Sequence, residues 1–265
     1  MQQTLSKVRW NRQVGPDVYQ IGLDCPEGYH NTQPGQFVMV HLPGQIAPLL
    51  ARPFSIFRLF RHANQTQGIE LLYKVVGEGT RRMASLVPGE RLDVLGPLGQ
   101  GFRITPDWHK VYIVAGGIGV APMVFLAEAL KPSGGGRRHQ QVFLGGRSQG
   151  DLLCADVFQS MGIPVHISTD DGSAGTHGLV TQPLQTSLAS DRPDVILACG
   201  PMGMLKGVAD IAADHGIACQ VSLETIMACG MGACLGCAFE SRSPDGRYRH
   251  VCLDGPVFDA AQIRL

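Results

Sequence analysis

The apolar and polar positions of this 265-residue chain follow two different rhythms. From the N-terminus to about residue 105, runs rich in Val, Ile, Leu, Phe and Tyr are broken by Gly and Pro at intervals of roughly ten to fifteen residues. This spacing is typical of an all-β domain and predicts a small antiparallel barrel. Strands are predicted at residues 36–42, 54–59, 69–76 and 91–95, with a short helix near 81–86.

Beyond Pro106 the pattern becomes apolar strand, glycine turn and amphipathic helix, repeated along the chain. This alternation predicts a parallel sheet with right-handed crossover helices, the doubly wound α/β class. Strands are predicted at 111–115, 141–144, 165–169, 195–198 and about 218–223, and helices at 121–130, 151–161 and 203–215. We therefore expect a β-barrel domain at 1–105, an α/β domain at 106–218 and a small C-terminal domain at 219–265.

The charges of the chain exclude some kinds of partner. Lys and Arg together number 22, as do Asp and Glu, so no field attracts nucleic acid or an anionic membrane. Residues 111–127 are uncharged and mostly apolar, but three glycines and Pro122 favour a strand, a turn and a helix over a membrane span. The first residues do not resemble a signal peptide, so we expect a cytoplasmic protein in a reducing environment.

Four cysteines near the C-terminus share a regular spacing, C-x4-C-x2-C-x14-C. This is the plant-type arrangement for a [2Fe–2S] cluster, and the small residues between them let backbone N–H groups approach the sulfurs. A zinc site, disulfides or free thiols are alternatives, but zinc sites usually pair two short knuckles and here there is one C-x2-C. The predicted cluster ligands are Cys229, Cys234, Cys237 and Cys252.

Three segments of the barrel region carry residues suited to a diphosphate. Residues 52–55 read Arg-Pro-Phe-Ser, 72–74 read Leu-Tyr-Lys, and 77–80 read Gly-Glu-Gly-Thr before the predicted helix. Alone, the first string is also an ordinary edge strand. Together, an arginine, a glycine-rich turn and a helix N-terminus could converge on one diphosphate.

These strings resemble the ferredoxin reductase flavoprotein superfamily, in which an R-x-[YF]-S strand and a G-x-x-[ST] turn hold FAD. The resemblance implies that Arg52 binds the diphosphate and that Ser55 hydrogen-bonds near flavin N5. Phe54 can cover the ring but offers no hydroxyl. The FAD-binding residues implied are Arg52, Pro53, Phe54, Ser55, Leu72, Tyr73, Lys74, Gly79 and Thr80.

Residues 116–122 read Gly-Gly-Ile-Gly-Val-Ala-Pro, between a predicted strand and a predicted helix, which is the order of a dinucleotide site. The string is weak alone, because its third motif glycine is replaced by Pro122, a residue suited to a first helical turn. Residues 199–202, Cys-Gly-Pro-Met, follow a later strand, at the edge where ligands bind open α/β sheets. Arg147 follows the second strand, where it would favour a 2′-phosphate or simply be solvated, so NAD and NADP both stay open.

Together these two strings resemble the pyridine-nucleotide domain of the same superfamily. The resemblance implies that Cys199 lies beside the nicotinamide without being catalytic, because the cofactors carry the hydride chemistry. The nucleotide-binding residues implied are Gly116, Gly117, Gly119, Cys199, Gly200 and Pro201. We assign no catalytic residue.

The three predicted sites form a relay. A nicotinamide exchanges two electrons as hydride, the cluster takes one electron at a time, and a flavin does both, so FAD belongs in the middle. Nothing else in the sequence forms a substrate pocket with an acid or base. The cluster therefore faces another protein.

The whole order resembles the family of electron-transfer subunits of dihydroorotate dehydrogenase B, most specifically at residues 227–237 and 252–258. It implies a heterotetramer, two copies of each chain, with an FMN-containing catalytic subunit that oxidises dihydroorotate in pyrimidine (UMP) biosynthesis. Electrons would pass from FMN to [2Fe–2S], FAD and NAD+. A diaphorase-type NAD(P)H:acceptor subunit of a hydrogenase or of a bifurcating ferredoxin:NADP oxidoreductase is one alternative, and a non-enzymatic metal-knuckle binding protein is another.

Overall fold

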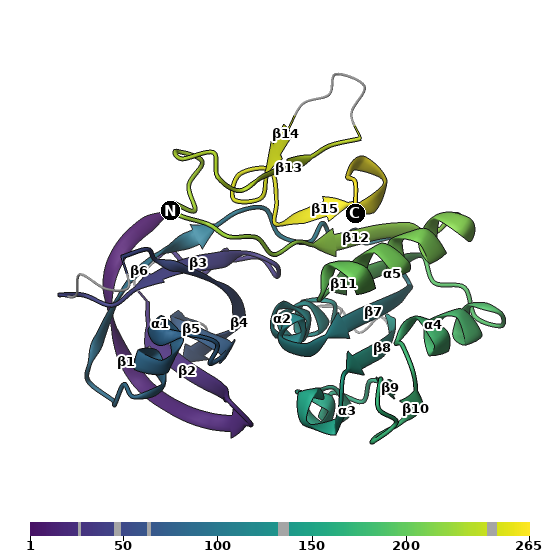
Figure 1. The fold of residues 1–265 in the computed structure, drawn as a ribbon, viewed down its shortest axis with the longest axis horizontal. Helices are drawn as coiled ribbons and strands as arrows, with labels where there is room; N and C mark the ends of the chain where they lie inside the picture. The colour runs from purple at the N-terminus through teal and green to yellow at the C-terminus, as the bar shows by residue number, and fades with distance from the viewer. Residues whose placement is uncertain (26–27, 45–48, 63–64, 132–137, 243–247) are drawn as a thin grey trace.

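A closed antiparallel barrel forms the N-terminal part of the molecule (Figure 1). The computed structural model describes residues 1–265 apart from 26–27, 45–48, 63–64, 132–137 and 243–247. The barrel strands pair in the order β1-β2-β5-β4-β3-β6. Their bounds are β1 Gln2–Gly15, β2 Val18–Asp24, β3 Phe37–His41, β4 Arg52–His62, β5 Gln65–Lys74 and β6 Arg91–Leu98, with helix α1 at Glu78–Ala84.

The barrel follows from alternation in its strands. Leu92, Val94, Gly96 and Leu98 of β6 are buried, whereas the positions between them are partly exposed. Strands β1 and β2 were not predicted from the sequence. In β1 only Ser6 and Val8 are buried, so its apolar signal is too weak to mark a strand.

Two predicted helices have different starts in the structure. Helix α1 begins at Glu78 rather than near Arg81, because Thr80 Oγ1 accepts the N–H groups of Val76 and Gly77 at 2.9 and 3.1 Å and fixes the first turn. Helix α3 spans Ala155–Ser160 rather than 151–161. Cys154 before it has a left-handed φ of 60°, which ends the helix on that side.

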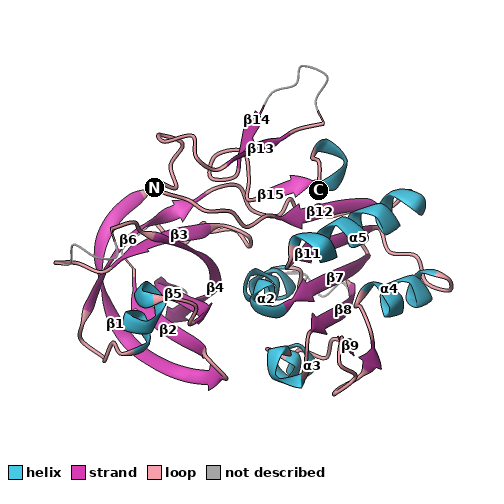
Figure 2. Ribbon diagram, in the orientation of Figure 1, coloured by secondary structure: helices cyan, strands magenta, loops and turns pink. Residues whose placement is uncertain are grey.

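A second sheet has the strand order β10-β9-β8-β7-β11-β12-β15, seven-stranded within the described residues (Figure 2). All pairs are parallel except β12 with β15. Strand β11 is buried at every position, as expected for a strand covered on both faces. The bounds are β7 Lys110–Gly116, β8 His139–Gly146, β9 Val165–Thr169, β10 Thr176–His177, β11 Val195–Cys199, β12 Ala218–Ser222 and β15 Val257–Asp259.

Helices cover both faces of this sheet. Helices α2 and α3 pack in one apolar cluster with the barrel residues Phe57 and Leu72, and α4 and α5 pack in another cluster on the opposite face. The remaining bounds are α2 Val120–Ala129, α4 Thr181–Leu188 and α5 Met202–Asp214, and short 3-10 turns cover Gly117–Gly119, Gln149–Asp151 and Ala260–Gln262. The predicted fold class, a barrel plus a doubly wound domain, is confirmed.

The C-terminal segment lies across the junction of barrel and sheet (Figure 1). It leaves β12, forms a small hairpin of β13 Ala238–Glu240 and β14 Tyr248–His250, and returns to the sheet as β15. Gln100 of the barrel side donates its N–H to the Gly255 carbonyl at 2.6 Å. Since β12 belongs to the sheet, we propose that the cluster segment begins after Ser222 rather than at residue 219.

The apolar stretch 111–127 is divided between β7 and α2. Among the described helices, none is long and apolar enough to cross a membrane.

Candidate functional site

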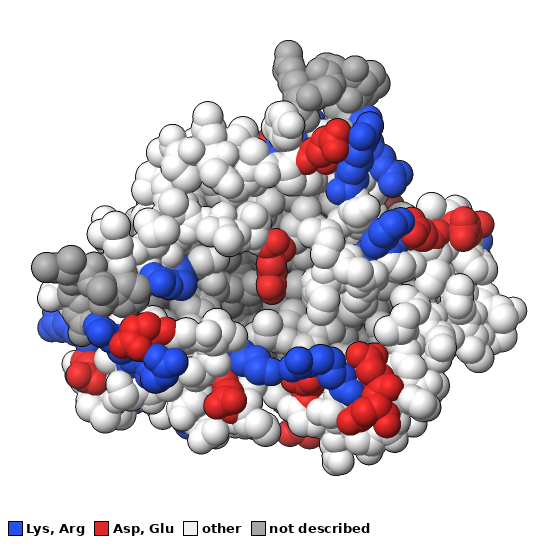
Figure 3. All heavy atoms as spheres, viewed as in Figure 1, with Lys and Arg blue, Asp and Glu red and all other residues white. Residues whose placement is uncertain are grey.

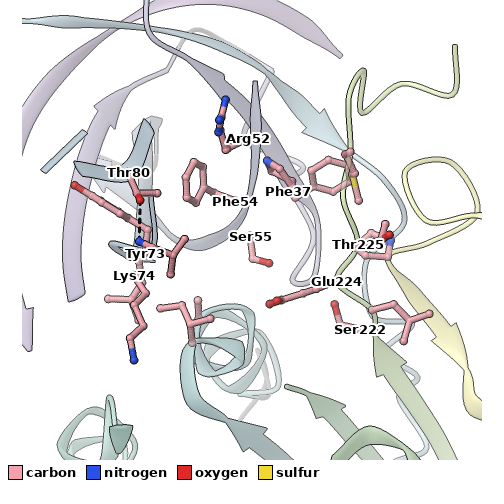
Figure 4. A pocket seen from close by; sticks show the side chains of 18 residues that line it. Phe37, Arg52, Phe54, Ser55, Tyr73, Lys74, Thr80, Ser222, Glu224 and Thr225 are labelled. Carbon is pink, nitrogen blue, oxygen red and sulfur yellow. Dashed lines mark hydrogen bonds between the residues drawn. The ribbon is translucent and has the colours of Figure 1, made fainter. Parts of the chain in front are cut away.

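A cavity of about 320 Å³ opens between the barrel and the sheet (Figure 4). Its walls come from β4, β5, α1, the start of α2 and the chain after β12. Of the residues predicted to bind FAD, those that line it are Arg52, Pro53, Phe54, Ser55, Leu72, Tyr73, Lys74 and Thr80. Gly79 does not; it lines a small neighbouring hollow that also touches Arg52.

Two cations reach this cavity, Arg52 and Lys74. Figure 4 shows them at different ends of it. One guanidinium nitrogen of Arg52 donates to the Leu50 carbonyl, which anchors the side chain at the rim. Its remaining N–H groups suit a phosphate oxygen, since arginine binds phosphate in a forked geometry.

Aromatic rings form one wall of the cavity. Phe54 lies edge-on to Tyr73, with ring centroids 5.9 Å apart and an interplanar angle of 67°. Tyr73 is buried, and its hydroxyl donates to Asn11 Oδ1 at 3.1 Å. Tyr73 therefore offers only its ring to the cavity, and the half-buried Phe54 is the better surface for a planar ligand such as a flavin.

Glu224 is a cavity residue that the sequence analysis did not assign. It is the only carboxylate on the described wall, and Figure 4 shows it pointing with Ser55 and Ser222 into the same part of the cavity. Glu224 is exposed to solvent in the open cavity, and desolvation by the protein around it raises its pKa. Its position after β12, at the carboxyl edge of a parallel sheet, is the sequence signal that would have identified it.

A second hollow, of about 560 Å³, lies across the carboxyl ends of β7, β8 and β9 and the start of α5. Of the predicted nucleotide-binding residues, Gly116, Gly117 and Pro201 line it. Lys74 lines both hollows, so the two sites meet at this side chain. The backbone is open at Gly117, where nothing lies within 4 Å of a Cβ built on the residue, and that nucleotide binding occurs here stays a prediction.

Gly119, Cys199 and Gly200 do not line the second hollow. A Cβ on Gly119 would lie 2.6 Å from the Cys199 carbonyl oxygen, so this glycine lets the turn pack against the end of β11. Burial raises the pKa of the Cys199 thiol, which keeps it neutral. A neutral, buried thiol agrees with a non-catalytic Cys199.

The four predicted cluster cysteines form two pairs. Cys237 and Cys252 are buried, with sulfurs 3.2 Å apart, and Cys234 donates its N–H to Cys229 Sγ at 3.4 Å. A [2Fe–2S] cluster takes two protein ligands on each iron, so two pairs fit it. Among the described residues, no group of three or more His, Cys, Asp or Glu side chains is close enough to hold a metal ion.

Backbone N–H groups point at these sulfurs. Met231 donates to Cys229 Sγ at 3.4 Å and Gly232 donates to Cys252 Sγ at 3.1 Å. Burial acts to raise the pKa of Cys229, but N–H donors, including those of Met231 and Cys234, lower it to about 7. These N–H groups favour the thiolate of Cys229, the form that binds iron, whereas burial and the neighbouring Cys237 raise the pKa of Cys252 to about 12.

Sequence comparisons match the chain to known families. Residues 224–264 match the iron–sulfur cluster binding domain of dihydroorotate dehydrogenase B, and residues 113–210 match an oxidoreductase NAD-binding domain. The dihydroorotate dehydrogenase B (NAD(+)) electron transfer subunit of Listeria monocytogenes is 39% identical over 270 residues, 100% of both chains. That of Caldanaerobacter subterraneus is 34% identical over 259 residues, 97% of both chains.

Solved structures share the fold. An NADH-dependent reduced ferredoxin-NADP oxidoreductase, studied for flavin-based electron bifurcation, gives a TM-score of 0.84 at 27% identity over 98% of this chain and 90% of that one. A Neisseria gonorrhoeae ferredoxin NADP+ reductase with bound FAD and NADP gives 0.66 at 16% identity, over 81% and 92%.

Proposed function

Because this chain belongs to the family of electron-transfer subunits of dihydroorotate dehydrogenase B, we propose that it carries electrons from a catalytic subunit to NAD+. The catalytic partner oxidises dihydroorotate on its FMN, in the pyrimidine pathway to UMP. The chain is an NAD-dependent oxidoreductase subunit that uses FAD, a [2Fe–2S] cluster and NAD(H). We place the complex in the cytoplasm as a heterotetramer, two of each subunit.

The observation that carries this proposal is the central position of the first cavity. Lys74 joins it to the nucleotide hollow on one side. Met227 also lines it and precedes the proposed cluster ligand Cys229 by two residues. A flavin held by Arg52, Phe54 and Ser55 would therefore lie between the nicotinamide and the cluster.

The proposed reaction needs a proton in this cavity as well as electrons. Bound FAD accepts electrons singly from the cluster and returns them to NAD+ as a hydride. A [2Fe–2S] cluster would supply electrons without protons, so the proton of that hydride would have to come from solvent, directly or through a protein group. Glu224, with its raised pKa, can hold this proton at its carboxyl group, and Ser55 lines the same part of the cavity.

The surface around the cluster loop suits a protein partner. Ile226 and Leu235 are 86% and 58% exposed, and Met231 and Leu253 are also exposed. Figure 3 shows that the upper left of this face is largely free of charge, whereas charged side chains gather along the lower and right edges. Exposed apolar side chains beside an electron-transfer centre are expected where the catalytic subunit docks.

The test is reconstitution. We expect the isolated chain to contain one FAD and one [2Fe–2S], and to oxidise NADH with an artificial acceptor but not dihydroorotate. Adding the FMN-containing catalytic subunit should produce dihydroorotate-dependent NAD+ reduction. A colourless, zinc-containing protein, or one that cannot couple to that subunit, would overturn the proposal.

One alternative has its own support, the NADH-dependent ferredoxin-NADP oxidoreductase, whose structure covers nearly all of this chain. In this alternative the flavin, cluster and nucleotide keep the same order, and only the protein that exchanges electrons with the chain differs. Ferredoxin-dependent NADP+ reduction by the native complex, without dihydroorotate oxidation, would favour it.

A further inference from the structure

Four charged side chains line the second hollow, and three of them form one ion-pair group. Asp151 accepts from Lys74 Nζ through Oδ1 at 3.0 Å and from Arg147 Nε through Oδ2 at 3.2 Å. The fourth belongs to Asp170, and its carboxylate makes no hydrogen bond or ion pair with any described residue. The cations of the hollow are thus both engaged by one carboxylate.

Local backbone structure fixes Asp151 in this position. It ends the 3-10 turn after β8, and its N–H donates to the Ser148 carbonyl at 3.0 Å. A Cβ on Gly146 would lie 3.1 Å from the Asp151 Cβ, so the glycine gives the residue room. The hydrogen bond from Lys74, helped by Arg147, lowers the pKa of Asp151, which is therefore ionised at neutral pH.

Arg147 is 80% exposed, and its one ion pair with a described residue joins its Nε to Asp151. A 2′-phosphate carries close to two negative charges and needs a cation, and Arg147 is the residue at this edge of the sheet that would supply it. Asp151 holds the Nε of Arg147, so Arg147 must leave Asp151 to bind a phosphate side-on through Nε and Nη together, and Asp151 would then keep Lys74 alone. The phosphate would then lie in a hollow that contains two carboxylates.

Asp170 provides a second carboxylate in this hollow. It follows β9, its N–H donates to the Gly146 carbonyl at 3.0 Å, and its exposed carboxylate lines the hollow. A nucleotide lying along the carboxyl edge, with its nicotinamide end toward the flavin cavity, has its adenosine ribose over β8 and β9. An unpaired carboxylate there accepts hydrogen bonds from ribose hydroxyls and repels a phosphate.

We infer that Asp151 selects NAD(H) over NADP(H) by holding Arg147 away from a 2′-phosphate, an assignment that rests on the proposed nucleotide site. Asp170 adds to the selection by binding the ribose hydroxyls. From the sequence, Arg147 could either bind a 2′-phosphate or be solvated. On this inference it is one of the residues that disfavour NADP.

The test compares two probes that differ only in the 2′-phosphate, ADP-ribose and 2′-phospho-ADP-ribose, bound to the FAD-loaded chain and measured by calorimetry. Asp151→Asn should shift the ratio of their dissociation constants about tenfold toward the phosphorylated probe, because a released arginine makes charge-assisted hydrogen bonds. Asp156→Asn, which removes an exposed charge outside the hollow, should leave the ratio unchanged.

The double variant Asp151→Asn/Arg147→Leu should lose the shift toward 2′-phospho-ADP-ribose. That loss would show that Arg147 causes the shift. An unchanged ratio in Asp151→Asn would overturn the inference while the proposed function stands. So would weaker binding of 2′-phospho-ADP-ribose in Arg147→Leu alone, because Arg147 would then already serve the phosphate. If the native chain bound neither probe and NADH did not reduce its flavin, the inference and the proposed function would both fail.

Discussion

The two hollows and the cysteine loop are built in contrasting ways. The hollows lie at the ends of strands and helices that pack together in buried apolar clusters. The positions of these elements therefore determine the shape of both hollows. The chain from Leu223 to Cys237 forms no described helix or strand, and it is held by N–H groups pointing at sulfur and by packing such as Gly230 against Met39. The cluster site therefore depends on its cluster, whereas the flavin and nucleotide sites should survive without it.

The largest effect on one site without the other is expected from Cys234→Ser. The variant should lose the cluster and all dihydroorotate-dependent NAD+ reduction, while NADH still reduces FAD, because none of the four predicted cluster cysteines lines either hollow. Iron content and visible spectra measure the first effect, and anaerobic NADH titration measures the second. Cys25→Ser, outside the cysteine group, should keep both. Loss of FAD reduction with the cluster intact would reverse the assigned order.

A smaller effect is expected inside the flavin cavity, from Glu224→Gln. Reduction of FAD from the partner side should slow about a hundredfold, the scale of general acid catalysis, while reduction by NADH, which brings its own hydride, should change less. The native rate should fall as pH rises through the raised pKa of Glu224, because the acid form is lost, and the variant should lack this dependence. Equal slowing from both directions would contradict a proton-donor role.

Arg52→Ala probes the rim of the same cavity. Losing charge-assisted hydrogen bonds to a diphosphate should weaken FAD binding about tenfold or more. Flavin content after gel filtration measures this, and iron content should be unchanged. Arg91→Ala, an exposed arginine on β6 outside the cavity, is the matched control. Full flavin retention would remove Arg52 from the site.

The smallest effect is expected at the loop surface, from Leu235→Asn. Leu235 has a φ of 58°, which Asn tolerates, so the change removes the apolar contact without straining the loop. Affinity for the catalytic subunit should fall several-fold to about tenfold, the usual range for an interface side chain, with cluster content intact. Val87→Asn, exposed in a barrel turn, should have no effect. Unchanged affinity would exclude Leu235 from the interface.

The same contrast explains what could be predicted from the sequence. The glycine turn at 116–119 and the Arg52–Ser55 strand have local signatures, and most of the residues named from them meet in the two hollows. The position of Glu224 after a predicted parallel strand could have marked it as a site residue, but its place across a cavity from β4 depends on long-range packing that no local pattern records. The pairing of Arg147 with Asp151 was missed because its effect depends on Lys74, a residue of the other domain. The roles proposed for Glu224 and for the Arg147–Asp151 pair both depend on contacts between residues far apart in the sequence.

The order of reduction tests the relay most directly. The isolated chain, mixed rapidly and anaerobically with NADH, should show bleaching of the flavin first and reduction of the cluster afterwards, and Cys234→Ser should show the first phase alone. Cluster reduction that precedes flavin bleaching, or that persists in Arg52→Ala protein stripped of FAD, would contradict a flavin placed between the nucleotide and the cluster.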